Sequence, residues 1–120
     1  MENAEQIVRH AEAVYRRRVV DEACAMYTPD AVIVWNGREV ARGPEQIRAF
    51  HEKFFEPAFR NVRLDKTLRA ASGDTIAVEW HATWDNPDGS RGEQTAAEHW
   101  TMRGAQLSEW RAFVHTRRVG

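Results

Sequence analysis

The stretch EHWTMRGAQLSEWRAFVH, residues 98–115, predicts two β-strands joined by a turn at Gly104. In the second strand, Trp110, Ala112 and Val114 share one parity, while a glutamate, an arginine and a histidine share the other. Turning the three apolar residues outward would bury the polar ones instead, at a much greater cost in free energy. We therefore expect Trp110, Ala112 and Val114 on the buried face of the sheet.

The same period of two predicts further half-buried strands upstream. Apolar residues alternate with polar ones over residues 62–70 and again in DTIAVEWHATWD, residues 74–85, where Trp80 lies on the apolar side. AVIVWNGREVAR, residues 31–42, is typical of a β-hairpin, because the pair Asn36-Gly37 readily adopts the positive φ angles of a two-residue turn.

Helices are expected before these strands. Apolar residues recur at helical spacing over residues 3–18 and 43–57, and a shorter helix is expected over residues 20–27. Helices gathered on one face of an antiparallel sheet indicate an α+β fold.

Length and composition limit the class of protein. A chain of 120 residues suits one domain, residues 1–120, and a net charge of −1 gives no reason to expect a nucleic acid or a membrane surface as partner. No apolar run approaches the roughly 20 residues that span a bilayer. The acidic start MENAEQIV lacks the apolar region of a signal peptide, and the single cysteine, Cys24, cannot form an internal disulfide. We therefore expect a cytoplasmic protein.

Four segments together resemble the nuclear transport factor 2-like superfamily, and within it the SnoaL-like polyketide-cyclase and ketosteroid-isomerase branch. They are AMYTPDAVIVWNG, ARGPEQIRAFHEKFF, GDTIAVEWHATW and the ending quoted above. The resemblance implies a cone in which three helices pack on a strongly curved, mostly antiparallel sheet of about six strands and enclose a pocket. This superfamily contains isomerases, cyclases, dehydratases, epoxide hydrolases, transport factors and binding domains, so the fold does not define the function.

The register that the resemblance implies turns Ala96, Glu98 and Trp100 inward, and places Glu98 where the isomerases carry the acid of their oxyanion hole. Desolvation in such a pocket disfavours the charged carboxylate, so Glu98 should be protonated and act as a general acid or base near neutral pH. Glu98→Gln should then leave the free energy of unfolding nearly unchanged. The alternative is a glutamate on the solvated convex face.

Two further residues are catalytic candidates. His51 lies on the apolar side of its helix, at a position where the isomerase branch carries a tyrosine of the active-site hydrogen-bond network, and is expected to partner Glu98; it could instead be a core histidine. The family's catalytic tyrosine matches Ala11 in this sequence, and Tyr15 lies one turn further along the same face of the helix. Trp35 stands where the isomerases carry their general-base aspartate, so steroid isomerase chemistry is not expected.

The expected function is that of a cofactor-free enzyme that transfers protons on a small, apolar, oxygen-bearing molecule, in isomerase, cyclase or dehydratase chemistry. The alternative is a ligand-binding or association domain without chemistry. No phosphate-binding loop and no metal-ligand spacing occurs in the sequence, so neither a cofactor nor a metal is expected. The superfamily often pairs through the convex sheet face, which predicts a homodimer. The expected substrate-binding residues, which could equally be core packing, are Trp35, Trp80, Ala96, Trp100, Trp110, Ala112 and Val114.

Overall fold

The computed structural model describes residues 3–119 and confirms the α+β class. The helices are α1 (Ala4–Arg17), α2 (Val20–Cys24) and α3 (Gly43–Phe54); the strands are β1 (Tyr27–Trp35), β2 (Arg38–Arg42), β3 (Arg60–Ser72), β4 (Thr75–Asp85), β5 (Arg91–Arg103) and β6 (Gln106–Val119). Among the described residues, no helix is both long and apolar enough to cross a bilayer.

The main differences from the sequence prediction lie near two prolines, and α2 also ends at Cys24 rather than at residue 27. Helix α3 ends at Phe54, short of the predicted end at Pro57, whose ring disfavours helical geometry at Glu56. Strand β1 begins at Tyr27 and contains Pro29, where the sequence indicated a break. The pairing of β1 with β6 shifts register between Tyr27 and Val32, and a bulge of this kind accommodates a proline within a strand.

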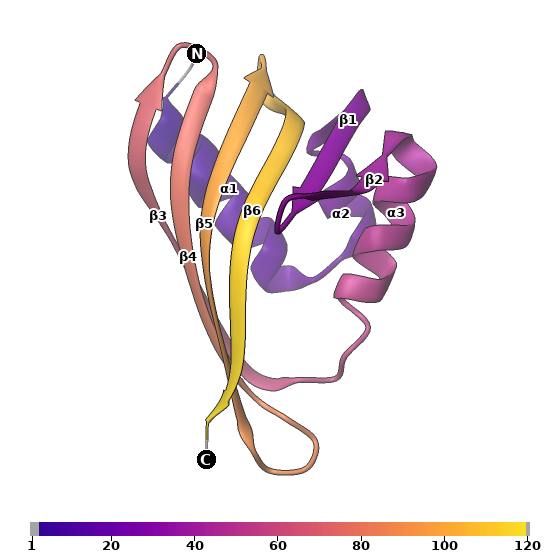
Figure 1. Ribbon diagram of the computed structural model, residues 1–120, viewed down its shortest axis with the longest axis vertical. Helices are drawn as coiled ribbons and strands as arrows, with labels where there is room; N and C mark the ends of the chain where they lie inside the picture. Colours follow the sequence, from indigo (N-terminus) through magenta and orange to yellow (C-terminus); the bar gives the residue numbers. More distant parts are fainter. Residues whose placement is uncertain (1–2, 120) are drawn as a thin grey trace.

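The strands form one sheet in the order β2-β1-β6-β5-β4-β3 (Figure 1). Neighbouring strands are antiparallel except β1 and β6, which run parallel. Asn36, in the turn after β1, secures this junction: its backbone N–H donates to the Ala112 carbonyl at 2.8 Å, and its Oδ1 accepts from the Val114 N–H at 2.7 Å. The first hairpin is thereby attached to the last strand of the chain.

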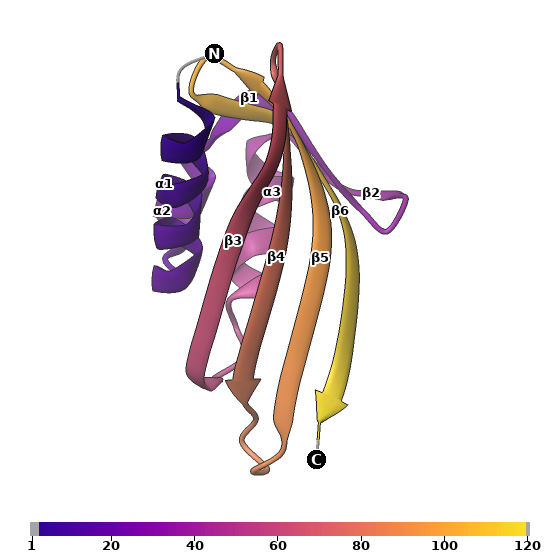
Figure 2. The ribbon, with the colours of Figure 1, turned by 90° about the vertical axis from the view of Figure 1, so that its left-hand side faces the viewer.

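The helices lie on one side of the curved sheet (Figure 2). Helix α1 packs on β3, and α3 packs on β1 and β2, so the two long helices cover opposite parts of the sheet. The Asn3 side chain caps α1 by accepting from the backbone N–H groups of Glu5 and Gln6. This arrangement leaves space between the helices and the sheet, where the core and a cavity lie.

The predicted strand parity is confirmed for most of the inward residues. Trp80 is 5% exposed and Trp110 is 2% exposed, while Phe113 on the opposite parity of β6 is 55% exposed. Ala96, Trp100 and Ala112 are buried as well. Val114 is only partly buried; the pairing of β1 with β6 extends only to Ala112, so no strand of residues 3–119 lies beside Val114 on that edge of β6.

Candidate functional site

A cavity of about 610 Å³ opens between the helices and the concave face of β3 and β4. Its volume lies in the range of small-molecule sites. The charged side chains in its lining are the cations Arg18, Lys53 and Lys66, and no carboxylate lines it. Within residues 3–119, no three His, Cys, Asp or Glu side chains gather in a way that could hold a metal ion. The aromatic residues of its wall are Tyr15, Trp35, Phe50, Phe54, Phe55, Phe59, Trp80 and Trp84.

Lys66 is a buried, cavity-lining residue that the sequence analysis missed. It lies on β3 with the same parity as Leu64 and Leu68, is 2% exposed, and lines the cavity. Its Nζ lies 2.9 Å from Oε2 and 3.1 Å from Oε1 of Glu98 on β5. The side chains of this ion pair are 1% and 0% exposed. The one feature of the sequence that could have indicated a buried lysine here is its position between two inward leucines of an alternating strand.

Glu98 faces inward as predicted, but its surroundings differ from the expected apolar pocket. Besides the two bonds from Lys66, its Oε1 accepts from the indole N–H of Trp100 at 3.1 Å and of Trp110 at 2.8 Å. All of these partners are donors, so together they stabilise the ionised carboxylate rather than a protonated acid. Glu98 does not line the cavity, whereas Lys66 does. Any influence of Glu98 on a ligand therefore passes through Lys66.

The Lys66 ammonium lies among aromatic rings. Its Nζ is 4.5 Å from the centroid of the Trp80 ring, 5.4 Å from that of Tyr15 and 5.5 Å from that of Trp100. Burial lowers the pKa of Lys66, and the Glu98 carboxylate partly offsets this effect. The pair thus combines a buried proton donor with an acceptor that holds it in place.

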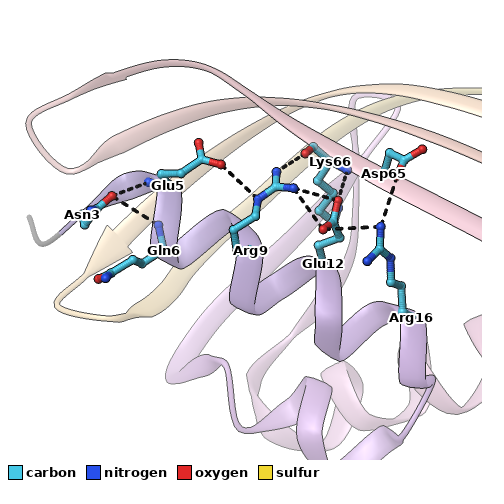
Figure 3. A network of polar contacts seen from close by, with 8 residues as sticks. All are labelled: Asn3, Glu5, Gln6, Arg9, Glu12, Arg16, Asp65 and Lys66. Atoms are coloured by element: carbon cyan, nitrogen blue, oxygen red, sulfur yellow. Dashed lines mark hydrogen bonds and ion pairs between the residues drawn. The ribbon is translucent and has the colours of Figure 1, made fainter.

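Helix α1 fixes the backbone of Lys66 (Figure 3). The buried Glu12 carboxylate accepts from the Lys66 backbone N–H at 2.7 Å and from Arg9 at 3.0 Å, and Arg9 also donates to the Lys66 carbonyl. One turn further along the helix, Arg16 Nε donates to the Leu64 carbonyl at 2.8 Å. These contacts hold both sides of the Lys66 peptide against α1, and so set the direction in which its side chain leaves β3.

A second polar cluster lies beside the ion pair. His51 Nδ1 is 2.9 Å from the Ile47 carbonyl oxygen, which can only accept, so Nδ1 carries the proton. Burial lowers the pKa of His51, which keeps the ring neutral and leaves Nε2 as an acceptor. Tyr15 therefore donates to Nε2 at 2.8 Å, and the Tyr27 hydroxyl, at 2.7 Å, donates to Tyr15. Because burial also raises the pKa of Tyr15, the three side chains form a neutral chain with one direction.

This chain does not include Glu98. Among the described residues, no hydrogen bond joins His51 to Glu98, so the predicted partnership of these two residues is not observed. Trp110 lies at the boundary between the clusters: its ring stacks on His51 at a centroid distance of 6.2 Å, and its N–H donates to Glu98. His51 therefore packs against the residues around Glu98 through the Trp110 ring.

The predicted site residues fall into three groups. Tyr15, Trp35 and Trp80 line the cavity. The others do not line it: Glu98, His51, Trp100, Trp110 and Ala112 are buried behind the wall, while Ala96 and Val114 border a separate groove shared with convex-face residues. The strand parity therefore identified inward residues correctly but not which of them reach the cavity.

The Trp80 indole carries a hydrogen-bond donor without a partner. Its Nε1 is buried and has no hydrogen-bond partner among residues 3–119. A buried donor without an acceptor is unfavourable.

Comparison with known families gives one match. A family model described as the SnoaL-like domain matches residues 7–110. None of the curated proteins compared with the chain matches it.

Solved structures share the fold at low sequence identity. A ketosteroid isomerase-like protein from Catenulispora acidiphila, in complex with trimethylamine, is 17% identical with a TM-score of 0.76, covering 92% of this chain and 85% of that one. SalBIII, an epoxide hydrolase/cyclase-like enzyme of pyran ring formation in salinomycin, is 21% identical with a TM-score of 0.73, covering 96% and 95%. TerC, co-crystallised with polyporic acid, is 18% identical with a TM-score of 0.70, covering 90% and 88%. These likenesses show a nuclear transport factor 2-like fold.

Proposed function

The chain belongs to the SnoaL-like domain family, and we propose that it is a cofactor-free enzyme that transfers protons on a small, largely apolar, oxygen-bearing substrate. The observation that carries this proposal is the buried Lys66–Glu98 pair, whose Lys66 end reaches the cavity. Isomerisation, cyclisation and dehydration all develop charge on a substrate oxygen. A fixed ammonium in a site that excludes water stabilises such charge effectively.

The lining of the cavity favours an anionic or carbonyl-bearing aromatic substrate. Arg18, Lys53 and Lys66 contribute cations to it and no carboxylate balances them. TerC was co-crystallised with an acid, which agrees with this preference. The Catenulispora protein holds an amine, but the cavity of this chain lacks the lining carboxylate that would favour a protonated amine.

In the proposed reaction, Lys66 is the catalytic residue. Its ammonium donates a proton to the substrate oxygen, and the amine that remains takes a proton back from the substrate. Glu98 is a positioning residue, which orients the ammonium and favours its charged form. Tyr15 directs its own proton to His51, so it offers the substrate only an acceptor oxygen.

The test is solvent exchange at an activated carbon. A panel of aryl ketones and phenolic acids in D₂O is followed by proton NMR with the wild type, Lys66→Met and the control Lys53→Met. The control removes a cavity-lining cation that forms no ion pair within residues 3–119. Loss of a general acid should slow exchange by about 10²-fold or more in Lys66→Met, with a much smaller effect in the control. Exchange by the wild type no faster than in buffer would contradict the enzyme proposal.

The alternative is binding without chemistry. Lys66 and Tyr15 are the buried titratable groups of the lining, which is a small set for an enzyme. Tight binding of the same panel, measured by calorimetry, with no exchange in the wild type would favour this alternative.

We also propose a homodimer through the convex sheet face. Phe113 is exposed there among ion pairs that join neighbouring strands, such as Arg69–Glu79 and His81–Glu93. A mixed apolar and charged surface suits a two-fold contact. Sedimentation velocity should show a dimer at micromolar concentration and a monomer for Phe113→Asp; a monomeric wild type would contradict the proposal.

A further inference from the structure

The distribution of lysine in this chain is uneven. Only Lys53 and Lys66 are lysines among its 17 Lys and Arg residues, and both line the cavity. An arginine would supply charge equally well, but its guanidinium does not lose a proton and cannot act as an amine. A lysine in the wall therefore offers chemistry that the many arginines of this chain do not.

We propose that Lys66 is a nucleophile that condenses with the carbonyl carbon of an aromatic aldehyde or ketone in the cavity, forming a Schiff base. This inference rests on the proposed function to the extent that both need the same ligand site. It goes further, because it names a carbonyl as the recognised group and a covalent bond as the outcome.

The surroundings of Lys66 support this chemistry. The ammonium must lose a proton before nitrogen can attack, and the Glu98 oxygens at 2.9 and 3.1 Å are placed to receive it. Burial among three aromatic rings disfavours the charged amine, as occurs in lysines that form Schiff bases.

The step balances in atoms and charge. The Lys66 amine attacks the carbonyl carbon, a C–N bond forms, and the C=O π electrons move to oxygen, which is protonated to a carbinolamine. The nitrogen lone pair then forms C=N as the hydroxyl leaves with a second proton, so that ammonium and aldehyde give an iminium ion and water. The iminium carries the same single positive charge as the ammonium. The buried Glu98 carboxylate is therefore compensated before and after the reaction.

Lys53 provides an internal comparison within the same cavity. It lies on α3 with an exposed side chain, so it resembles an ordinary surface amine at the cavity mouth. A ligand that merely concentrated an aldehyde in the cavity would bring it near both lysines. Preferential reaction at Lys66 would therefore report the environment of its nitrogen rather than proximity alone.

The experiment is reductive trapping. The native protein is incubated with 2-naphthaldehyde and sodium cyanoborohydride, and the secondary amines formed are located by peptide mass mapping. We expect Lys66 to be modified at least about tenfold faster than Lys53, because burial disfavours the charged form of the Lys66 amine and the Glu98 oxygens can receive its proton. The preference should disappear in urea, and Lys53→Arg should retain the Lys66 label.

Calorimetry with 2-naphthalenemethanol, which has the same rings but no carbonyl, separates this inference from the proposed function. If the alcohol binds and Lys66 reacts no faster than Lys53, the Schiff-base inference is overturned while the ligand site stands. If the alcohol does not bind and no lysine of the native protein is labelled preferentially, both are overturned. Because mapping is done on the wild type, the result does not depend on whether a Lys66 variant folds.

Discussion

Replacing Lys66 by methionine should lower the free energy of unfolding by about 3–5 kcal/mol at neutral pH, because it leaves the buried Glu98 carboxylate without a cation. Methionine fills a similar volume, so the loss of charge dominates over the loss of packing. Glu98→Gln should cost a similar amount, since it leaves the Lys66 ammonium buried and unpaired. The sequence analysis did not include Lys66, and it predicted almost no cost for this change. The side chains of the pair are 1% and 0% exposed, so water screens neither charge.

The double variant Lys66→Met/Glu98→Gln decides whether the pair acts as a unit. Removing both charges also removes their desolvation cost, and a glutamine can still accept from Trp110, so most of the stability should return. Urea unfolding followed by circular dichroism gives the free energies by linear extrapolation. Arg69→Met/Glu79→Gln is the matched control, because this cross-strand pair is 58% and 55% exposed and should contribute no more than about 1 kcal/mol.

The reasoning would be refuted if either single variant were as stable as the wild type, or if the two single costs simply added in the double variant.

Three further predictions concern the residues around the pair. Burial lowers the pKa of His51 below 6.5, so the folded protein binds a proton on this ring less readily than the unfolded chain does. The free energy of unfolding should therefore fall as pH drops below 6.5. Unfolding curves of His51→Asn should show a smaller fall. A Cβ at Gly92 would overlap the Trp84 indole in the cavity wall, so Gly92→Ala should lower the free energy of unfolding by about 1–3 kcal/mol, measured in urea, and weaken binding of 2-naphthalenemethanol. Glu12→Ala strips the Lys66 backbone N–H of its acceptor and should cost about 1–3 kcal/mol in the same assay; unchanged trapping at Lys66 would show that Glu12 does not position it.

The parity of the strands could be predicted from the sequence because it depends on local alternation. Trp80 and Trp110 recur on the apolar side of long strands, and the pleat turns all residues of one parity to one face. Lys66 could not be assigned in this way. Its partner Glu98 lies 32 positions away, on a strand that is not its neighbour in the sheet, and a single sequence does not show such a non-local pair.

The cavity wall was also beyond prediction from strand parity alone. Inward residues at one end of β5 and β6, such as Trp100, are covered by the core, whereas Phe55 and Phe59 reach the cavity from the segment after α3. Arg18 holds that segment by donating to the Pro57 carbonyl at 3.2 Å, from a left-handed backbone with φ of 55°. Contacts of this kind depend on how a helix and a loop dock, which residue alternation does not specify.

The parallel contact between β1 and β6 has a bearing on how the protein is made. Asn36 and Val114, which that junction joins, lie 78 positions apart, so the hairpin of β1 and β2 emerges from the ribosome well before the strand it must pair with. Until then Trp35 cannot complete its packing against Trp110 of β6. Closing so long a stretch of chain is slow and leaves apolar surface uncovered meanwhile. The nascent chain should therefore need protection by chaperones until β6 has emerged, and a stop codon early in β6 should yield an insoluble product rather than a smaller domain.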